Sequence, residues 1–88
     1  MSPRRVTQSA NLVEAFLDMM SAERGAGANT LAAYSRDLAD FANHADPGKA
    51  SRAEVQAFLA ALSKSTAPST QARKLSALRQ FFGFLYAE

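Results

Sequence analysis

The apolar residues of this chain recur at intervals of three and four in four successive segments, and short runs rich in glycine, proline or serine separate these segments. Such spacing places the apolar side chains of each segment on one face of an α-helix. No segment alternates apolar and polar residues as a half-buried strand would. A chain of 88 residues suits one small domain. The sequence therefore predicts an all-α fold, a compact bundle of four helices with short connections.

The expected helices are bounded by recognisable start and stop signals. The first runs from residue 9 or 11 to 24, the second from 29 to about 45, the third from 51 to 62, and the last from between 66 and 70 to near the chain end. Ser51 and Glu54 form a full capping box, and Asn11 with Glu14 forms a looser one. Asn29 is the expected N-cap of the second helix. The expected buried faces are Leu12, Val13, Phe16, Leu17 and Met20; Leu31, Tyr34, Leu38, Phe41 and Ala45; Val55, Phe58, Leu59 and Leu62; and Leu75, Leu78, Phe82 and Leu85.

The last segment, residues 69–87, contains three cations and no acid. The side opposite its apolar stripe carries Thr70, Arg73, Ala77 and Gln80, and Lys74 and Arg79 supply further charge. A helix with an apolar back and a cationic front can pack in a core and also lie against phosphates and base edges. The alternative is an amphipathic helix whose charged face is only solvated.

The charge distribution favours contact with an anionic partner on one side of the domain. The net charge is only +2, but the first helix carries Glu14, Asp18 and Glu23 without a base between residues 9 and 23, whereas the last helix is basic. Such asymmetry produces a directional field. Residues 1–8, with adjacent arginines at 4 and 5, are expected to form a disordered basic arm, either a plain tail or a segment that reaches extra phosphates.

Residues that would support catalysis or metal binding are scarce. The chain has no cysteine and one histidine, His44, which is expected to be exposed near the end of the second helix. No glycine loop resembles a phosphate cradle, and no serine lies in a nucleophile motif. We therefore expect no cofactor, no metal site and no enzymatic activity for this segment alone. No apolar run reaches membrane-spanning length, and the start of the chain is typical of a cytosolic protein.

Two segments, taken together, resemble one protein family. Residues 29–41, NTLAAYSRDLADF, resemble the NT-x-x-x-Y-x-x-D-L-x-x-F segment of tyrosine recombinases. Residues 73–85, RKLSALRQFFGFL, resemble their R-x-L-S-A-L-R-x-F-F-x-F-L segment. Both segments occur in the family's order and spacing, and the likeness covers residues 10–87. The chain is similar to the N-terminal core-binding domain of the XerC/XerD group, and to XerD more than to XerC.

The resemblance implies a SAM-like bundle, like the N-terminal domain of lambda integrase, over residues 9–88. In this family the domain forms half of a clamp on DNA, and a catalytic domain, absent from this chain, cleaves the DNA. The implied partners are a double-stranded recombination half-site, the protein's own catalytic domain and partner recombinase subunits, in the bacterial cytoplasm at the nucleoid. The roles left open are DNA integration and chromosome dimer resolution. The residues expected at DNA are Asn29, Thr30, Ala33, Arg36, Thr70, Arg73, Lys74, Ala77, Arg79 and Gln80.

Individual roles within that surface differ. The start of the second helix should meet phosphate, Lys74 is the expected phosphate contact of the last helix, and Arg73 and Gln80 are candidates for base edges. Arg79 could instead pair with an acid such as Asp37. Asp37 and Asp40 suit the orientation of basic side chains or the capping of loops better than contact with DNA.

Other functions remain open at this point. A SAM-like domain that binds another protein is the main alternative, because Phe84 points along the Arg73 side and is either covered by other helices or exposed to a partner. A helix-turn-helix regulator is a second alternative, although the usual glycine-containing turn between two helices is missing. Tyr34 and Tyr86 lie on apolar stripes, at positions that the resemblance assigns to the core, and neither matches the catalytic tyrosine of the family.

Overall fold

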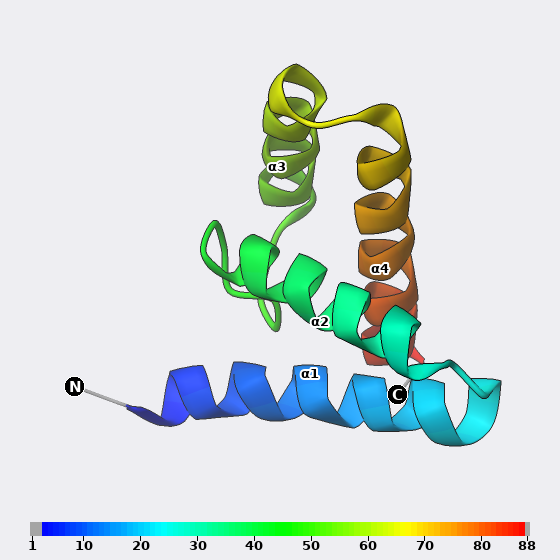
Figure 1. Cartoon of the computed structure of the whole chain (residues 1–88). Helices are drawn as coiled ribbons and strands as arrows, with labels where there is room; N and C mark the ends of the chain where they lie inside the picture. The colour runs from blue at the N-terminus through cyan, green and yellow to red at the C-terminus, as the bar shows by residue number, and fades with distance from the viewer. Residues whose placement is uncertain (1–2, 88) are drawn as a thin grey trace.

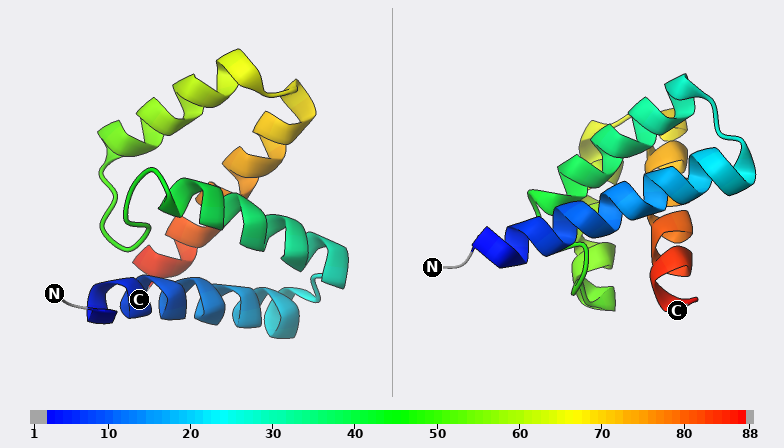
Figure 2. Two further views of the ribbon diagram at one scale, coloured as in Figure 1. Left: turned by 60° about the vertical axis from the view of Figure 1, so that its left-hand side comes forward. Right: turned by 90° about the horizontal axis from the view of Figure 1, so that it is seen from below.

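The computed structural model describes residues 3–87, with side chains from residue 11 onward. Within these residues it contains four helices and no strand: α1 (Pro3–Arg24), α2 (Ala28–Ala42), α3 (Arg52–Ser65) and α4 (Pro68–Tyr86). The predicted all-α fold of four helices is confirmed. Figure 1 shows two helical hairpins, α1 with α2 and α3 with α4, and α2 crosses α4 where the hairpins meet. Figure 2 shows the same crossing from two further directions.

Several local signals act as the sequence predicts. Ser51 is the N-cap of α3: its hydroxyl accepts a hydrogen bond from the Glu54 amide at 3.2 Å, and the Glu54 carboxylate accepts one from the Ser51 amide at 2.9 Å. Gly25 follows α1 with a φ of 63°, a conformation that favours glycine at a helix end. Pro68 occupies the first position of α4, where its missing N–H is not needed.

Four predicted helix ends are wrong. The third helix, α3, continues to Ser65 instead of ending at residue 62. The first helix begins at Pro3, so residues 3–8 are helical rather than part of a disordered arm, and Asn11 lies inside the helix; Met1 and Ser2 lie outside the described residues. A proline suits a first helical turn because that turn has no partner for its N–H. Gly27, not Asn29, is the N-cap of α2. The second helix ends at Ala42 instead of Ala45.

The chain leaves the helix after Ala42 and forms a turn that leads to Pro47. The residue before a proline is disfavoured in helical conformation, so Asp46 sets the furthest limit of the helix at Ala45. The chain turns here instead, and the Asp46 carboxylate accepts a hydrogen bond from the Gly48 amide at 3.0 Å. The exposed His44 lies just past the helix, as predicted.

The core is built around phenylalanines from all four helices. Phe16, Phe41 and Phe81 are fully buried, and Phe58 of α3 packs edge-on against Phe41 with ring centroids 5.1 Å apart. Most predicted apolar faces are confirmed as buried or partly buried members of this core. Phe84 packs against Phe16 at a centroid distance of 5.8 Å, so other helices cover it, which was one of the two alternatives.

The buried face of α4 differs from the prediction. It consists of Lys74, Ala77, Leu78 and Phe81, whereas Leu75, Phe82 and Leu85 are only partly buried. The reason is that α4 packs against α1 and α2 on one flank and against α3 on another, so its buried arc is wider than a single stripe and centred elsewhere. The core position expected for Tyr86 is wrong, because this residue is 77% exposed.

Candidate nucleic-acid interface

Four charged residues meet where α2 crosses α4, and we call this group, Asp37, Asp40, Arg73 and Lys74, the ion cluster. The Arg73 guanidinium binds the Asp37 carboxylate through two parallel hydrogen bonds, Nε to Oδ2 at 2.9 Å and Nη2 to Oδ1 at 2.7 Å. Bidentate geometry of this kind gives the strongest arginine–carboxylate pairs. The Asp37 side chain is 1% exposed and that of Arg73 is 41% exposed, so the pair joins the interior to the surface.

Lys74 completes the ion cluster from the buried side. Its ammonium donates to Asp37 Oδ1 at 2.9 Å and to Asp40 Oδ2 at 2.6 Å. The Lys74 side chain is only 9% exposed, while Asp40 lies at the solvent edge. Two cations thus face two anions, and the cluster carries no formal net charge. Asp37 accepts three hydrogen bonds in all, which offsets the cost of burying its charge.

The cluster also changes the pKa values of its members. Burial by itself raises the pKa of Asp37, but the hydrogen bonds and charges of Arg73 and Lys74 outweigh burial and hold that pKa below its ordinary value. Burial lowers the pKa of Lys74, and the hydrogen bonds from its ammonium to Asp40 and Asp37 raise it by more. The hydrogen bond to Asp37 raises the pKa of Arg73. All three groups are therefore charged at neutral pH.

These contacts correct several predicted roles. Ala77 has no exposed surface and lies in the core, so it cannot contact DNA. Lys74 is buried with its ammonium bound to two carboxylates, so its predicted role as a phosphate contact is also wrong. The residue that pairs with Asp37 is Arg73 and not Arg79. The prediction that Asp37 and Asp40 orient basic side chains is confirmed.

The first turn of α2 and its outer face present the predicted residues to solvent. Asn29 and Thr30 are exposed in the first turn, and no side chain caps this helix end. The free N–H groups of a first turn, with the positive end of the helix dipole, attract anions. Arg36 is exposed further along the same helix, whereas Ala33 is half-buried. Three of the predicted residues of α2 are therefore at the surface, and Ala33 is partly buried.

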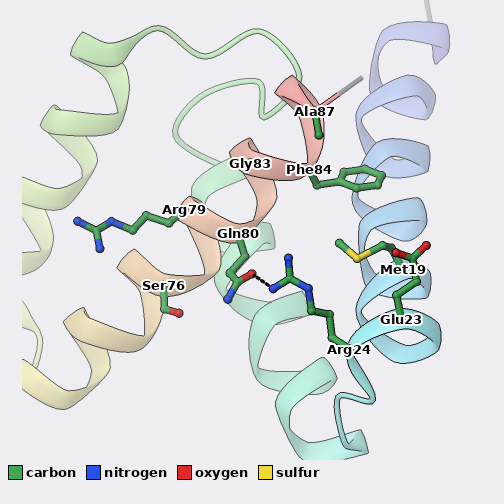
Figure 3. A pocket seen from close by; sticks show the side chains of 9 residues that line it. All are labelled: Met19, Glu23, Arg24, Ser76, Arg79, Gln80, Gly83, Phe84 and Ala87. Carbon is green, nitrogen blue, oxygen red and sulfur yellow. Dashed lines mark hydrogen bonds between the residues drawn. The ribbon is translucent and has the colours of Figure 1, made fainter.

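The remaining predicted residues lie elsewhere on α4. Thr70 is half-buried near the start of the helix, and Arg79 is exposed. Gln80 is half-buried, and its side-chain oxygen accepts a hydrogen bond from Arg24 Nη1 at 2.9 Å. Figure 3 shows this pair in a groove between α1 and α4, with Arg79 extending away from it toward α3. The sequence gives no local signal for the Arg24 contact, because 56 residues separate the two partners.

Comparison with known proteins identifies the family. Residues 13–88 match the model of the phage integrase N-terminal SAM-like domain. The chain belongs to this family. This integrase N-terminal domain is 54% identical over 86 residues to the tyrosine recombinase XerD of Rhizobium meliloti (strain 1021), an alignment that covers 91% of the chain and 28% of the relative.

Other relatives of the integrase domain agree. It is 47% identical over 90 residues to XerD of Brucella abortus biovar 1 (strain 9-941), covering 94% of the chain and 29% of that protein. It is 46% identical over 83 residues to the tyrosine recombinase XerC of Erythrobacter litoralis (strain HTCC2594), covering 94% of the chain and 27% of that protein. The predicted resemblance to XerC/XerD recombinases is confirmed, and the name XerD predominates among the relatives found.

The relatives are much longer than this chain. The integrase domain spans less than a third of the length of these relatives. No solved structure matches it significantly. Within the described residues, none of the helices has the length and apolar character needed to cross a membrane.

Proposed function

We propose that this chain is the DNA-binding N-terminal domain of a site-specific tyrosine recombinase, and that it positions a recombination half-site for strand exchange by a separate catalytic domain. The observation that carries the proposal is membership of the integrase N-terminal family, together with relatives named tyrosine recombinases. The two roles that suit such a domain are DNA integration and chromosome dimer resolution. The mechanism is positional: the domain supplies contacts with DNA, and other parts of the recombinase supply the chemistry.

The exposed residues of α2 and Arg73 support a DNA-binding surface. Asn29 and Thr30 offer a first turn suited to phosphate, and Arg36 adds an exposed cation. Arg73 lies on the neighbouring helix with a partly exposed guanidinium, a group suited to phosphates and to guanine edges. Thr70 and Gln80 stay in the proposed surface as predictions. Arg79 extends toward α3 (Figure 3) and lies outside this surface, and Lys74 and Ala77 leave it.

The proposal includes partners and a place of action. Double-stranded DNA is the ligand, and the domain's own catalytic domain and partner recombinase subunits complete the assembly. We place this assembly in the bacterial cytoplasm at the nucleoid, where its DNA lies. We assign no catalytic role to the tyrosines of this segment. The Tyr34 hydroxyl shares a hydrogen bond of 3.0 Å with Ser76, which joins α2 to α4.

An NMR titration tests the proposed surface. The ¹⁵N-labelled chain is titrated at low salt with a duplex that carries a Xer-type half-site, and then with a scrambled duplex of equal length. We expect selective shifts at Asn29, Thr30, Arg36 and Arg73 that weaken as salt rises, because phosphate contacts release counterions. Absence of shifts at high duplex concentration, or shifts confined to the first eight residues, contradicts the proposal.

A protein-binding domain of the same shape is the second candidate, and one observation favours it. Tyr86 is 77% exposed and stacks on Phe82 at a centroid distance of 6.2 Å, which leaves aromatic surface at the end of α4. Phe84 does not favour this candidate, since it packs on the core. A chain that ignores both duplexes but shows concentration-dependent shifts around Tyr86 with a catalytic domain of a Xer recombinase would favour it.

A further inference from the structure

We infer that Asp37 is a positioning residue for DNA binding: it holds the Arg73 guanidinium by one edge, so that the remaining N–H groups face hydrogen-bond acceptors of duplex DNA. This inference rests on the proposed function and adds a residue that does not touch DNA itself. The juxtaposition that carries it is a carboxylate buried at the α2–α4 crossing, bound to a guanidinium that reaches solvent.

The geometry of Arg73 leaves donors available. An arginine side chain has five N–H donors in a planar fork. Two of the nitrogens, Nε and Nη2, donate to Asp37. Among the described residues, Asp37 is the only hydrogen-bond partner of Arg73, so the Nη1 group and the second Nη2 hydrogen are free. One Nη2 hydrogen and one Nη1 hydrogen share the outer edge of the fork, and that edge can donate to a phosphate or to a guanine.

The anchor beneath Arg73 is itself fixed. Lys74 donates to the same oxygen of Asp37 that accepts from Arg73 Nη2, and it also donates to Asp40 on the next turn of α2. A buried carboxylate with three donors has little freedom to rotate. Arg73 therefore loses part of its rotamer entropy on folding, before any DNA is bound, and such preorganisation favours binding. Arg36 offers a contrast, because it is exposed on α2 and no described residue holds it.

The charge of the ion cluster makes it possible to distinguish a positioning role of Asp37 from a purely electrostatic effect on DNA affinity. The formal charges of its four members cancel, so the cluster as a whole does not attract a polyanion. Replacing Asp37 with asparagine removes one negative charge and, on electrostatic grounds alone, should tighten DNA binding. If Asp37 positions Arg73, the same replacement should weaken binding, because the guanidinium loses its bidentate anchor. The two explanations therefore predict changes of opposite sign.

The decisive experiment compares Asp37→Asn with Asp40→Asn, a matched control that makes the same charge change in the same cluster. Asp40 does not contact Arg73. Affinity for the half-site duplex is measured by fluorescence anisotropy, and circular dichroism verifies folding. We expect Asp37→Asn to weaken binding about tenfold, as the loss of a charge-assisted contact would, and Asp40→Asn to bind as tightly as the wild-type chain or tighter. Equal or tighter binding by Asp37→Asn overturns the inference.

A double-mutant cycle tests whether Asp37 acts through Arg73. We expect Asp37→Asn to cause no further loss of affinity in an Arg73→Ala background. A second loss of similar size overturns the positioning role. The scrambled duplex distinguishes the acceptor: if the effect of Asp37→Asn is the same on both duplexes, Arg73 donates to phosphate, and if it is confined to the half-site, Arg73 donates to a base edge. Both results support the inference.

If Asp37→Asn does not fold, a measurement on the wild-type chain tests whether Arg73 stays bound to Asp37. The arginine Nε–H signals are followed by ¹⁵N–¹H NMR during titration with the half-site duplex. We expect the Arg73 Nε–H signal to stay near its free-protein position while the Nη signals shift. An Nε–H signal that moves to the position of unpaired arginines shows that Arg73 leaves Asp37 on binding, which overturns the inference alone. No binding to either duplex overturns the proposed function as well.

Discussion

The cations of α2 and α4 fall into two groups that the sequence alone does not separate. Arg73 and Lys74 belong to the ion cluster and are bound to acids of α2, whereas Arg36 and Arg79 are exposed. All four stand in helices with suitable spacing for a charged face. The difference teaches that a cationic side chain near an anionic ligand is not automatically a contact, because its charge can already be bound inside the fold, as that of the buried Lys74 is.

The same comparison separates stability from binding. A buried charge that loses its partner is costly, since the remaining charge stays desolvated. An exposed charge contributes little to folding but releases a counterion when it meets a phosphate. We therefore expect substitutions in the ion cluster to act first on the free energy of unfolding. Substitution of Arg36, the exposed arginine of α2, should act first on the salt dependence of DNA binding.

The largest expected effect is the loss of stability on replacing Asp37 with alanine. This change leaves the buried ammonium of Lys74 with Asp40 alone, and we expect the free energy of unfolding to fall by about 3 kcal/mol. The measurement is urea denaturation followed by circular dichroism. Asp18→Ala, which removes an exposed acid from α1, is the control and should change stability by less than about 0.5 kcal/mol. Equal effects of the two substitutions would contradict a structural role for the ion cluster.

A smaller loss is expected for Lys74→Met, which keeps the stem of the side chain and removes its charge. Asp37 retains Arg73 and Asp40 is near solvent, so we expect a fall of about 1–2 kcal/mol. In DNA binding, the slope of log affinity against log salt should stay unchanged for Lys74→Met. The matched variant Arg36→Met should reduce that slope by about 0.9, the loss of one phosphate contact. A reduced slope for Lys74→Met would return that residue to the DNA surface.

Much of the fold could be predicted because it depends on local signals. Ser51 with Glu54 and Pro68 at the start of α4 act within one helical turn, and the structure places them as expected. The ends of α1 and α2 were predicted less well. The expected cap at Asn11 lies inside a helix that begins at Pro3, and Asn29 yields its capping position to Gly27. Polar residues that can cap a helix are common, and the sequence alone does not show which of them occupies the N-cap position.

The candidate site could be predicted only in part, because its decisive contacts are far apart in sequence. Asp37 lies 36 residues from Arg73, and helical spacing carries no information about which face of α2 meets which face of α4. The stripe of Leu75 and Phe82 suggested that Ala77 faces outward. Because α4 packs against other helices on two flanks, Ala77 lies in the core, and Lys74 is buried as well. The exposure of Asn29, Thr30 and Arg36 needed no such information and is confirmed, whereas Ala33 is half-buried. Their contact with DNA stays a prediction.

A change of pH tests the contribution of the buried Asp37 carboxylate to stability without changing the sequence. The folded-state pKa of Asp37 is lowered, so its contribution to stability is complete above the ordinary aspartate pKa of about 3.9 and is lost as the pH falls through the lowered value. We therefore expect the urea midpoint to fall as the pH drops below about 4. This fall should be smaller in Asp37→Asn than in Asp18→Asn. Parallel pH profiles for the two variants would show that Asp37 does not contribute.

The smallest expected effect concerns Arg79, the exposed arginine of α4. Six residues separate it from Arg73, which places the two about 120° apart around the helix, and Arg79 extends toward α3. One duplex lying against Arg73 and α2 would therefore lie away from Arg79. We expect Arg79→Ala to change stability by less than about 0.5 kcal/mol and to leave the salt slope nearly unchanged. A reduction of the salt slope as large as that of Arg36→Met would mean that the DNA surface continues around α4. Arg73, bound to Asp37, and the exposed Arg79 would then belong to two parts of one interface.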